Sequence, residues 1–368
     1  MASQVLTLRQ INRATLARQM LLARERVAPL KAIERLVGLQ AQWPRPPFVG
    51  LWSRVHGFAR ADLAKLLRGR KVVRATSLRG TLHLVTATDF IGLRPTLQPV
   101  LDAGMRSIVR QRGAAVDTDR LVAQARAILA EEPKTFEDLR ERLLHDDPGG
   151  DERAMGYAVR MLLPLVQVPE DEFAWSFPTQ PRFALAEKWL GRKVATKGDA
   201  RPDLLVLRYL AAYGPAGVAD AQAWSGVGGL RDTFEGLRPR LACFRDEQGR
   251  ELFDLPKASR PAGDVPAPVR LVPEYDNLIA ARADERFVAR RDRPRVFLSA
   301  LRIAATVLVD GFAVGTWKIE RSRTAAKMAI EPFAPFTART RKEVAAEADA
   351  LLRFAEPDAR AFELRFAG

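Results

Sequence analysis

Apolar residues in the first forty positions recur at the three- to four-residue spacing of helices. The pattern starts after Thr7, a residue type that commonly caps helix N-termini, and predicts a first helix up to about Leu22. It resumes after Pro29 and predicts a second helix that passes through Leu36 and ends near Leu39.

The period then changes from that of a helix to that of strands. The stretch "ARADLAKLLRG" predicts a short amphipathic helix that ends at Gly69. The stretch "KVVRATSLRGTLHLVTA", which follows, contains two β-rich runs on either side of a Ser-Leu-Arg-Gly turn. Helix, helix, helix and hairpin is the order of a winged helix-turn-helix, and we predict such a module in residues 1–115.

The same order of elements recurs twice without visible repetition of the sequence. Helices are predicted over residues 117–131, 135–144 and 151–165, and again over 202–213, 217–225 and 229–240. Each set is followed by a predicted hairpin, first "VQVPEDEFAWSF" with "RFALA" and then "LACFRDEQGRELFDL". We therefore predict a second winged helix in residues 116–199 and a third in residues 200–258.

A stretch rich in Pro, Ala and Gly, "PKASRPAGDVPAPV", separates these modules from the rest of the chain. Beyond it, "VRLVPEYDNLIA", "ATVLVDGFAVGTWKIER" and "AKMAIEPFA" are β-patterned, and Asp310-Gly311 marks a tight hairpin turn. One more helix is predicted over residues 342–354, and a last strand in "AFELRFAG". Residues 259–368 thus form a small β-rich module, and the fold class is α+β.

Composition limits the classes of protein. With 47% apolar and 28% charged residues, the chain is globular rather than disordered. We expect a soluble cytoplasmic protein, because no signal peptide and no uncharged apolar run of about 20 residues is visible. A lone cysteine, Cys243, and scattered His56, His83 and His145 give no basis for a disulfide, a zinc or di-iron site, or any other cofactor.

The net charge of +15 is concentrated in one part of the chain. Residues 1–115 hold 20 Lys and Arg against 5 Asp and Glu, whereas residues 116–368 hold 39 of each. A solvated basic face would explain this excess, but its complete asymmetry favours a polyanionic partner, most simply double-stranded DNA.

Two glutamines stand out within this basic part, in "GLQAQWPRPP". Side chains two apart in an extended segment point the same way, and Trp43 precedes a proline that disfavours helix. With Pro44, Pro46 and Pro47 stopping the helix, Gln40 and Gln42 are expected to project together and hold one water. The alternative is two solvated glutamines at a helix end.

The alternating strand "RGTLHLV" adds to the candidate site. Arg79, Thr81 and His83 share one face, and packing Leu82 and Leu84 inward would turn them outward on the wing. We predict that all three contact DNA. His83 has three candidate roles: binding phosphate, orienting water, or a structural hydrogen bond on the wing.

Further residues of the basic module are candidates for DNA contacts. Trp43 is a candidate for stacking on bases, whereas Phe48 and Trp52 stand at helical spacing and are expected in the core. The basic residues that we predict to contact DNA are Arg45, Lys71 and Arg74.

Taken together, "LQAQWP", "RGTLHLV", "LVPEYDNLIAARADERFV" and "VDGFAVGTW" resemble the bacterial winged-helix DNA glycosylases. That family includes the azinomycin-resistance glycosylase and an enterobacterial relative that unhooks interstrand crosslinks. The resemblance spans nearly the whole chain. It implies three winged helices around a concave basic surface, a β-barrel-like C-terminal module, a monomer, and monofunctional hydrolysis of the N-glycosidic bond of alkylated purines.

The family's catalytic element is a Gln, a small or apolar residue, then Gln or Asp. It falls here on Gln40, Ala41 and Gln42, which places the chain with the Gln-x-Gln branch and makes the two glutamines the implied catalytic residues. Whether the crosslink activity of the Gln-x-Asp branch extends to this chain is left open, as is base flipping.

The implied chemistry agrees with the residue types. An N7- or N3-alkylated purine is cationic and leaves as a neutral base, so what remains is to place a water against an oxocarbenium-like sugar. Neutral glutamines suit activity on destabilised, cationic lesions. Glu274 and Asp276 in "PEYDNL" are the candidate carboxylates near the site, with an Asx-turn cap as the alternative role for Asp276 or Asn277.

A winged-helix transcription regulator, or another non-enzymatic DNA-binding protein, would explain the basic module and the hairpins equally well. It would give no reason for the glutamine pair, nor for three modules of which two are balanced in charge. The sequence therefore favours a DNA glycosylase over a regulator.

Overall fold

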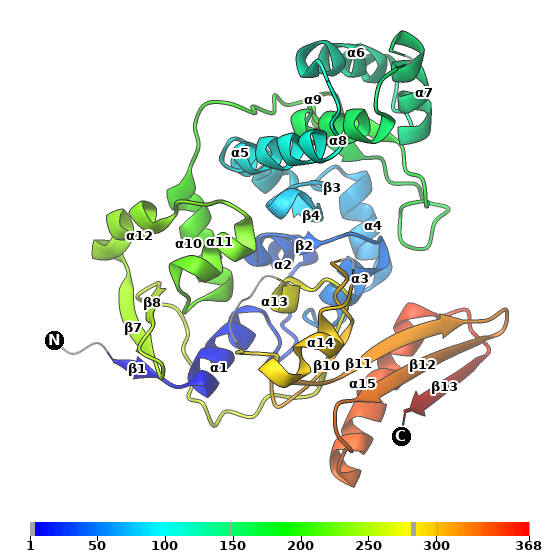
Figure 1. The fold of residues 1–368 in the computed structure, drawn as a ribbon. Helices are drawn as coiled ribbons and strands as arrows, with labels where there is room; N and C mark the ends of the chain where they lie inside the picture. The colour runs from blue at the N-terminus through cyan, green and yellow to red at the C-terminus, as the bar shows by residue number, and fades with distance from the viewer. Residues whose placement is uncertain (1–3, 148, 281–284, 300, 368) are drawn as a thin grey trace.

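The computed structural model describes residues 4–147, 149–280, 285–299 and 301–367. Within these residues, helices and strands alternate along the chain, and the strands form three sheets (Figure 1). The fold class is α+β, as the sequence predicts.

The first 111 residues contain more elements than the three helices and hairpin predicted from their pattern. They are β1 (Val5–Leu6), α1 (Leu8–Arg18), α2 (Pro29–Leu36), β2 (Leu39–Gln40), α3 (Arg45–Trp52), α4 (Arg60–Arg68), β3 (Val72–Thr76), the 3-10 turn η1 (Leu78–Gly80), β4 (Leu82–Thr86) and α5 (Ala87–Gln111). The Thr7 side chain caps α1 by accepting from the N–H of Gln10, as predicted. The long helix α5 has no counterpart in the prediction.

The predicted end of the second helix is wrong. Helix α2 ends at Leu36, because Val37 and Gly38 take positive φ angles of 56° and 97° and turn the chain onto β4. A Cβ on Gly38 would lie 2.5 Å from Val85 Cγ1, so the close approach of the two segments requires a glycine there.

The role predicted for the prolines is also wrong. Pro46 and Pro47 lie in the first turn of α3, which begins at Arg45, and so they start a helix instead of preventing one. The N–H groups of a first turn have no acceptor within the helix, so proline is tolerated there.

The second group of helices is joined to the first by a shared sheet. Its elements are α6 (Thr118–Glu131), α7 (Phe136–Asp146), α8 (Glu152–Leu162), β5 (Leu165–Gln167), β6 (Phe183–Leu185) and α9 (Ala186–Leu190). The predicted helices and hairpin are confirmed. Strand β5 also pairs with β3, which gives one sheet of order β2-β4-β3-β5-β6 and places Gln167 opposite Arg74.

The third group follows its predicted order. It consists of α10 (Pro202–Tyr213), α11 (Val218–Ser225), α12 (Arg231–Leu237), the 3-10 turn η2 (Arg238–Arg240), β7 (Ala242–Asp246) and β8 (Glu251–Asp254). The N-terminal strand β1 (Val5–Leu6) extends its hairpin by pairing in parallel with β7. Arg18 of α1 donates to both carboxylate oxygens of Asp254 at 2.7 and 2.8 Å, so α1 is held against this group.

The C-terminal part is an open sheet of order β13-β12-β11-β10-β9, with Val344 and Leu351 of α15 packed in its core. Its elements are β9 (Arg270–Val272), α13 (Asn277–Ala280), η3 (Arg290–Asp292), α14 (Arg293–Val296), β10 (Thr306–Val309), β11 (Phe312–Arg321), β12 (Ala325–Pro332), α15 (Ala338–Ala355) and β13 (Ala361–Phe366).

The Asp310-Gly311 turn joins β10 to β11 as predicted. The barrel-like expectation is wrong, because the two edge strands do not pair within the described residues and α15 packs on the sheet instead. Residues 281–284 of "LVPEYDNLIAARADERFV" lie outside the described residues.

Candidate active site

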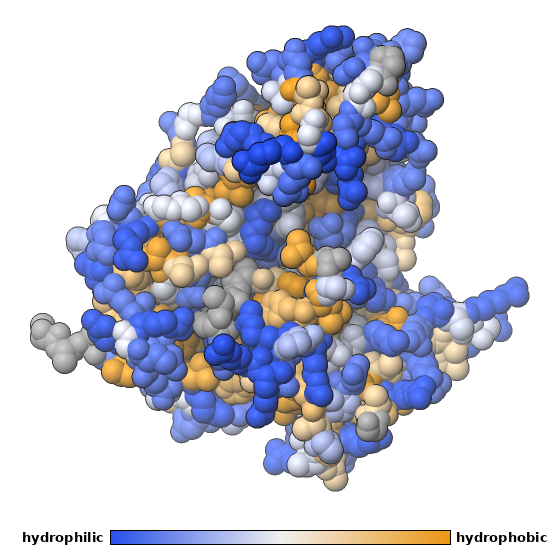
Figure 2. All heavy atoms as spheres, in the orientation of Figure 1, coloured by the Kyte–Doolittle hydropathy of each residue, from blue (hydrophilic) through white to orange (hydrophobic). Residues whose placement is uncertain are grey.

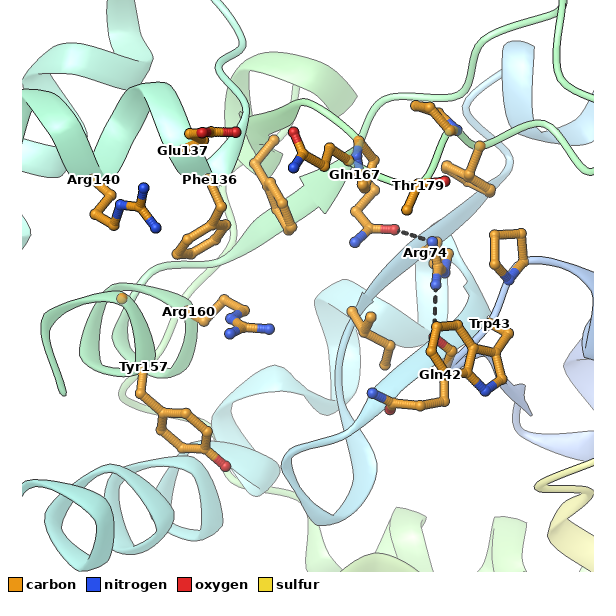
Figure 3. Close-up of a pocket in the computed structure, with 18 of the residues that line it drawn as sticks. Gln42, Trp43, Arg74, Phe136, Glu137, Arg140, Tyr157, Arg160, Gln167 and Thr179 are labelled. Atoms are coloured by element: carbon orange, nitrogen blue, oxygen red, sulfur yellow. Dashed lines mark hydrogen bonds between the residues drawn. The ribbon is translucent and has the colours of Figure 1, made fainter. Parts of the chain in front are cut away.

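Gln40 and Gln42 lie at the edge strand of the five-stranded sheet. Gln40 is opposite His83 of β4, and the N–H of Ala41 donates to the carbonyl of Leu82 at 2.8 Å. The Gln40 side chain is buried, with 8% of it exposed, whereas Gln42 is exposed and points into a cavity (Figure 3). The pair therefore lies on an extended segment, and of the two carboxamides Gln42 is the one open to a ligand.

Arg79 holds the Gln40 carboxamide. Its Nη2 donates to Gln40 Oε1 at 2.7 Å and to Asn277 Oδ1 at 3.2 Å, and its Nη1 donates to the carbonyl of Trp224. Arg79 lies in the turn η1 with a φ of 56°, a left-handed backbone that is uncommon for a residue with a side chain. With Oε1 engaged by Arg79, Gln40 keeps its Nε2 as a hydrogen-bond donor.

Arg74 clamps the backbone of the same segment. Its Nε donates to the carbonyl of Ala41 at 2.9 Å, its Nη2 to the carbonyl of Gln42 at 3.1 Å, and its Nη1 to Gln167 Oε1 at 2.5 Å. The guanidinium also lies over the ring of Phe177, 5.1 Å from its centroid. All three acceptors are neutral. Burial lowers the pKa of Arg74 to about 10, so the side chain stays charged at neutral pH.

The outward orientation predicted for the wing strand is wrong. His83 is fully buried and Leu82 is partly exposed on the cavity wall, because β4 lies between β2 and β3 with the Asn277 segment beside it. His83 Nδ1 lies 3.1 Å from the carbonyl of Thr81, which can only accept, so this nitrogen carries the proton. Burial, with Arg79 nearby, lowers the pKa of His83 to about 3.

The carboxylates that sequence reasoning placed near the site are engaged elsewhere. Asp276 is buried and accepts from both terminal nitrogens of Arg54 at 2.8 Å, and its Oδ1 also accepts from the N–H of Leu278. The capping alternative for Asp276 is therefore the observed one. Glu274 is half-buried beside Arg45 on a separate small pocket.

The aromatic residues near the glutamine segment differ in burial. Phe48 is buried and Trp52 packs against the same core, as expected. Trp43 is 56% exposed on the cavity rim and lies beside Tyr275, whose φ of 60° is again left-handed. Trp43 thus presents an open aromatic face next to Gln42.

The other predicted DNA-contacting residues differ in exposure. Lys71 is exposed, and Arg45 is half-buried with its Nη1 3.8 Å from a carboxylate oxygen of Glu356. Thr81 donates its hydroxyl to the carbonyl of Leu78 at 3.2 Å. Of these three residues, Lys71 is the one most accessible to a phosphate.

A cavity of about 880 Å³ opens beside Gln42, between the first and second groups of elements. Figure 2 shows this face of the molecule hollowed, with hydrophilic residues around the hollow. Its walls include Arg160 and Tyr157 of α8 and Gln167 of β5 (Figure 3). Phe177, in the loop over residues 168–182, also lines it. Sequence reasoning missed these residues, because their approach to Gln42 depends on the pairing of β3 with β5.

Among the residues that the structure describes, no cluster of three or more His, Cys, Asp or Glu side chains is arranged to hold a metal ion. No helix in the described ranges is both long enough and apolar enough to cross a membrane.

Comparison with known proteins places this arrangement in a family. A curated relative from Streptomyces sahachiroi, described as an interstrand DNA cross-link repair glycosylase, is 26% identical over an alignment of 332 positions that covers 84% of this chain and 87% of the relative. The solved structure of the DNA glycosylase AlkZ from the same organism superposes with a TM-score of 0.79 at 22% identity, covering 99% of this chain and 100% of that one, and shows the same fold. Residues 33–354 match the model of the family described as DNA glycosylase AlkZ-like. The chain belongs to the AlkZ-like DNA glycosylase family.

Proposed function

We propose that this DNA glycosylase hydrolyses the N-glycosidic bond of cationic or bulky N-alkylpurines in double-stranded DNA, with Gln42 positioning the attacking water. One observation carries this proposal. The Gln42 carboxamide is exposed at the mouth of an arginine-lined cavity, while Arg79 fixes Gln40 and Arg74 fixes the backbone between them.

The proposed chemistry depends on how the attacking water is positioned. An alkylated purine leaves as a neutral base, so the reaction needs little general-acid help, and the attacking water needs orientation more than deprotonation. Gln42 Oε1 accepts a hydrogen bond from that water, and Gln40 Nε2 supplies a donor to the site. Asp276 is tied to Arg54 and offers no free carboxylate to stabilise the sugar cation, which restricts the enzyme to bonds already weakened by alkylation.

We further propose that the three groups of helices and hairpins are winged-helix modules, in residues 1–115, 116–199 and 200–258, followed by the C-terminal module in residues 259–368. The order of helices and hairpin in each group supports this division. The basic excess of the first module supports phosphate contacts by Lys71 and Arg45.

The name of the Streptomyces sahachiroi relative also supports an extension to crosslinked DNA. We propose that the enzyme unhooks interstrand crosslinks formed through N-alkylated purines, as repair or as self-resistance to a genotoxin. It would act as a monomer, and on chromosomal DNA in the cytoplasm.

Base release from defined lesions tests the proposal. Duplexes that contain N7-methylguanine, N3-methyladenine or a nitrogen-mustard crosslink are incubated with the enzyme, and abasic sites are then measured by strand cleavage. Gln42→Ala should abolish release while its affinity for DNA stays within a few fold. Gln111→Ala, an exposed glutamine on α5, is the matched control. Wild-type rates for Gln42→Ala on N7-methylguanine DNA would contradict the proposed role.

A further inference from the structure

The five-stranded sheet has a second face, which lies away from the cavity. Successive residues of a strand point to opposite faces of a sheet. Arg74 of β3 lines the cavity (Figure 3). Its neighbours Val73 and Ala75 therefore point the other way, where they share a separate core with Trp189 of α9. The surface over α9 is thus on the opposite side of the sheet from Gln42.

Cations without carboxylate partners gather on this second face. They come from the turn between α4 and β3 and from the loop after α9, and they are Arg70, Lys71, Arg192 and Lys193. All four are exposed, and none forms an ion pair with a residue in the described ranges. The turn and the loop are joined, because Arg70 Nη1 donates to the carbonyl of Trp189 at 2.9 Å. We call these four residues the back patch.

The carboxylates near the back patch are engaged with other groups. Asp62 of α4 accepts from the backbone N–H at the start of its own helix at 2.9 Å, and Glu187 of α9 pairs with Arg126 of α6. Asp171 pairs with Arg68 at 2.8 Å. The positive charge of the back patch is therefore not neutralised by direct ion pairs, and such a surface attracts a polyanion.

Arg70 is held in an orientation that suits a phosphate. Its guanidinium lies over the ring of Trp189, 4.5 Å from the centroid, and its Nη1 bond to the carbonyl of the same residue fixes it further. The side chain is nevertheless exposed, and its Nη2 donates to no group that the structure describes. A planar fork that is already fixed loses little freedom when it binds a phosphate.

We propose that the back patch is a second DNA-binding site, which holds the backbone of an undamaged duplex segment while the lesion lies at Gln42. This inference goes beyond base release and does not depend on the role of Gln42. The chain belongs to a family of DNA glycosylases, so duplex DNA is the polyanion that it meets while it acts. The two sites bind separate segments, because the sheet lies between them and DNA is stiff over about 150 base pairs.

A second site keeps the enzyme on DNA between encounters with lesions. Non-specific binding at a single site has a dissociation constant of about 10⁻⁴ to 10⁻⁶ M at physiological salt. When one of two sites releases its segment, the other still holds DNA, and the free site meets new segments at an effective concentration in the mM range. The enzyme would then pass from segment to segment without leaving the chromosome.

Bridging of two duplexes tests the proposal. A short undamaged duplex on beads is mixed at low salt with the full-length protein and a fluorescent copy of the same duplex, and the retained fluorescence is measured. The variant is Arg192→Glu with Lys193→Glu, two exposed residues of a loop. Arg339→Glu with Lys342→Glu makes the same change in charge on exposed positions of α15 and is the matched control.

The wild type and the control should retain the fluorescent duplex, whereas the double variant should retain at least about tenfold less, because two of its four cations are reversed. Base release from a short duplex with one N7-methylguanine should stay within twofold in all three proteins. No retention by the wild type, or equal retention by the double variant, would overturn the proposal. Loss of base release together with retention would also overturn it, because the back patch would then belong to the surface that binds the lesion.

The proposed function is tested separately in this design. A wild type that bridges duplexes but releases no base would contradict the proposed function and leave the second site intact.

Native mass spectrometry identifies the bridging species. One protein with two duplexes is the expected complex, and bridging only by two copies of the protein would overturn the proposal. Vesicles of phosphatidylglycerol separate DNA from a lipid surface. If the double variant loses binding to these vesicles but still bridges duplexes, the back patch binds lipid headgroups and the proposal is wrong.

Discussion

Replacing Arg74 by lysine should separate a role in positioning Gln42 from a role in binding DNA. The sequence predicts Arg74 as a DNA contact, yet the residue is 4% exposed and its guanidinium donates to protein oxygens of Ala41, Gln42 and Gln167. Lysine keeps the positive charge but has a single nitrogen without the planar fork. It cannot reach both carbonyls of the glutamine segment and the Gln167 side chain at once.

The size of the effect follows from the bonds that are lost. A hydrogen bond from a charged donor contributes about 1.5–3 kcal/mol. Freeing the carbonyls of Ala41 and Gln42 lets the segment shift, and a misplacement of about 1 Å in a catalytic group costs about 100-fold in rate. That factor equals about 3 kcal/mol in the activation free energy. We therefore expect Arg74→Lys to lower the single-turnover rate of base release about 100-fold.

The affinity for DNA should change little, since the guanidinium is buried against the protein. Fluorescence anisotropy with an undamaged duplex should give a dissociation constant within about threefold of the wild type. Arg68→Lys, an exposed arginine on α4, is the control for a surface charge swap. Added guanidinium should partly restore the rate of Arg74→Ala. If Arg74→Lys weakens DNA binding but leaves the rate at saturating enzyme unchanged, the positioning role is refuted. Arg74 would then be assigned a direct contact with DNA.

Two further measurements address His83 and Lys71. The pKa of His83 is lowered to about 3, below its unfolded value near 6.5, so the folded state resists protonation and stability is lost as the pH falls from about 6.5 toward 3, by about 1.4 kcal/mol per unit. Urea unfolding should therefore show that the free energy of unfolding falls less between pH 7.5 and pH 4.5 for His83→Gln than for the wild type. An equal decrease in the two proteins would contradict a buried neutral histidine. Lys71→Ala should weaken binding to any duplex alike and reduce the slope of log affinity against log salt by about 1; an unchanged slope would exclude a phosphate contact.

Local sequence was enough to predict much of the fold. Helix periodicity, the Thr7 cap and the Asp310-Gly311 turn depend on neighbours in the chain, and all three are confirmed. The misread end of α2 shows the limit. Gly38 turns the chain because Val85 of a distant strand lies against it, and no local period encodes that contact. The proline run predicts a helix stop, but Pro46 and Pro47 lie in the first turn of α3, where proline is tolerated.

The sequence predicts the two glutamines of the candidate site, but it does not predict the contacts that hold them in place. The quoted motif identifies Gln40 and Gln42, but Arg79 reaches Asn277 across 198 positions and Arg74 reaches Gln167 across 93. These partners meet because β5 joins the sheet of β3 and because the Asn277 segment packs against β4. The predicted outward orientation of His83 on β4 is wrong for the same reason, because the burial of His83 depends on the segments that pack against this strand.

The charge asymmetry of the chain also takes on a different meaning once it is folded. Residues 1–115 carry the whole excess of +15, but several of their arginines are buried against carboxylates from the balanced part of the sequence. The pairs are Arg13 with Asp310, Arg18 with Asp254, and Arg54 with Asp276. Each such pair neutralises a cation of residues 1–115 inside the protein, and its carboxylate is no longer available to pair with a cation of residues 116–368. The positive charge available to DNA is thereby shared with later elements, including the arginines of α8 that line the cavity, so a surface for DNA and its lesion has to be sought across the groups and not in the basic third alone.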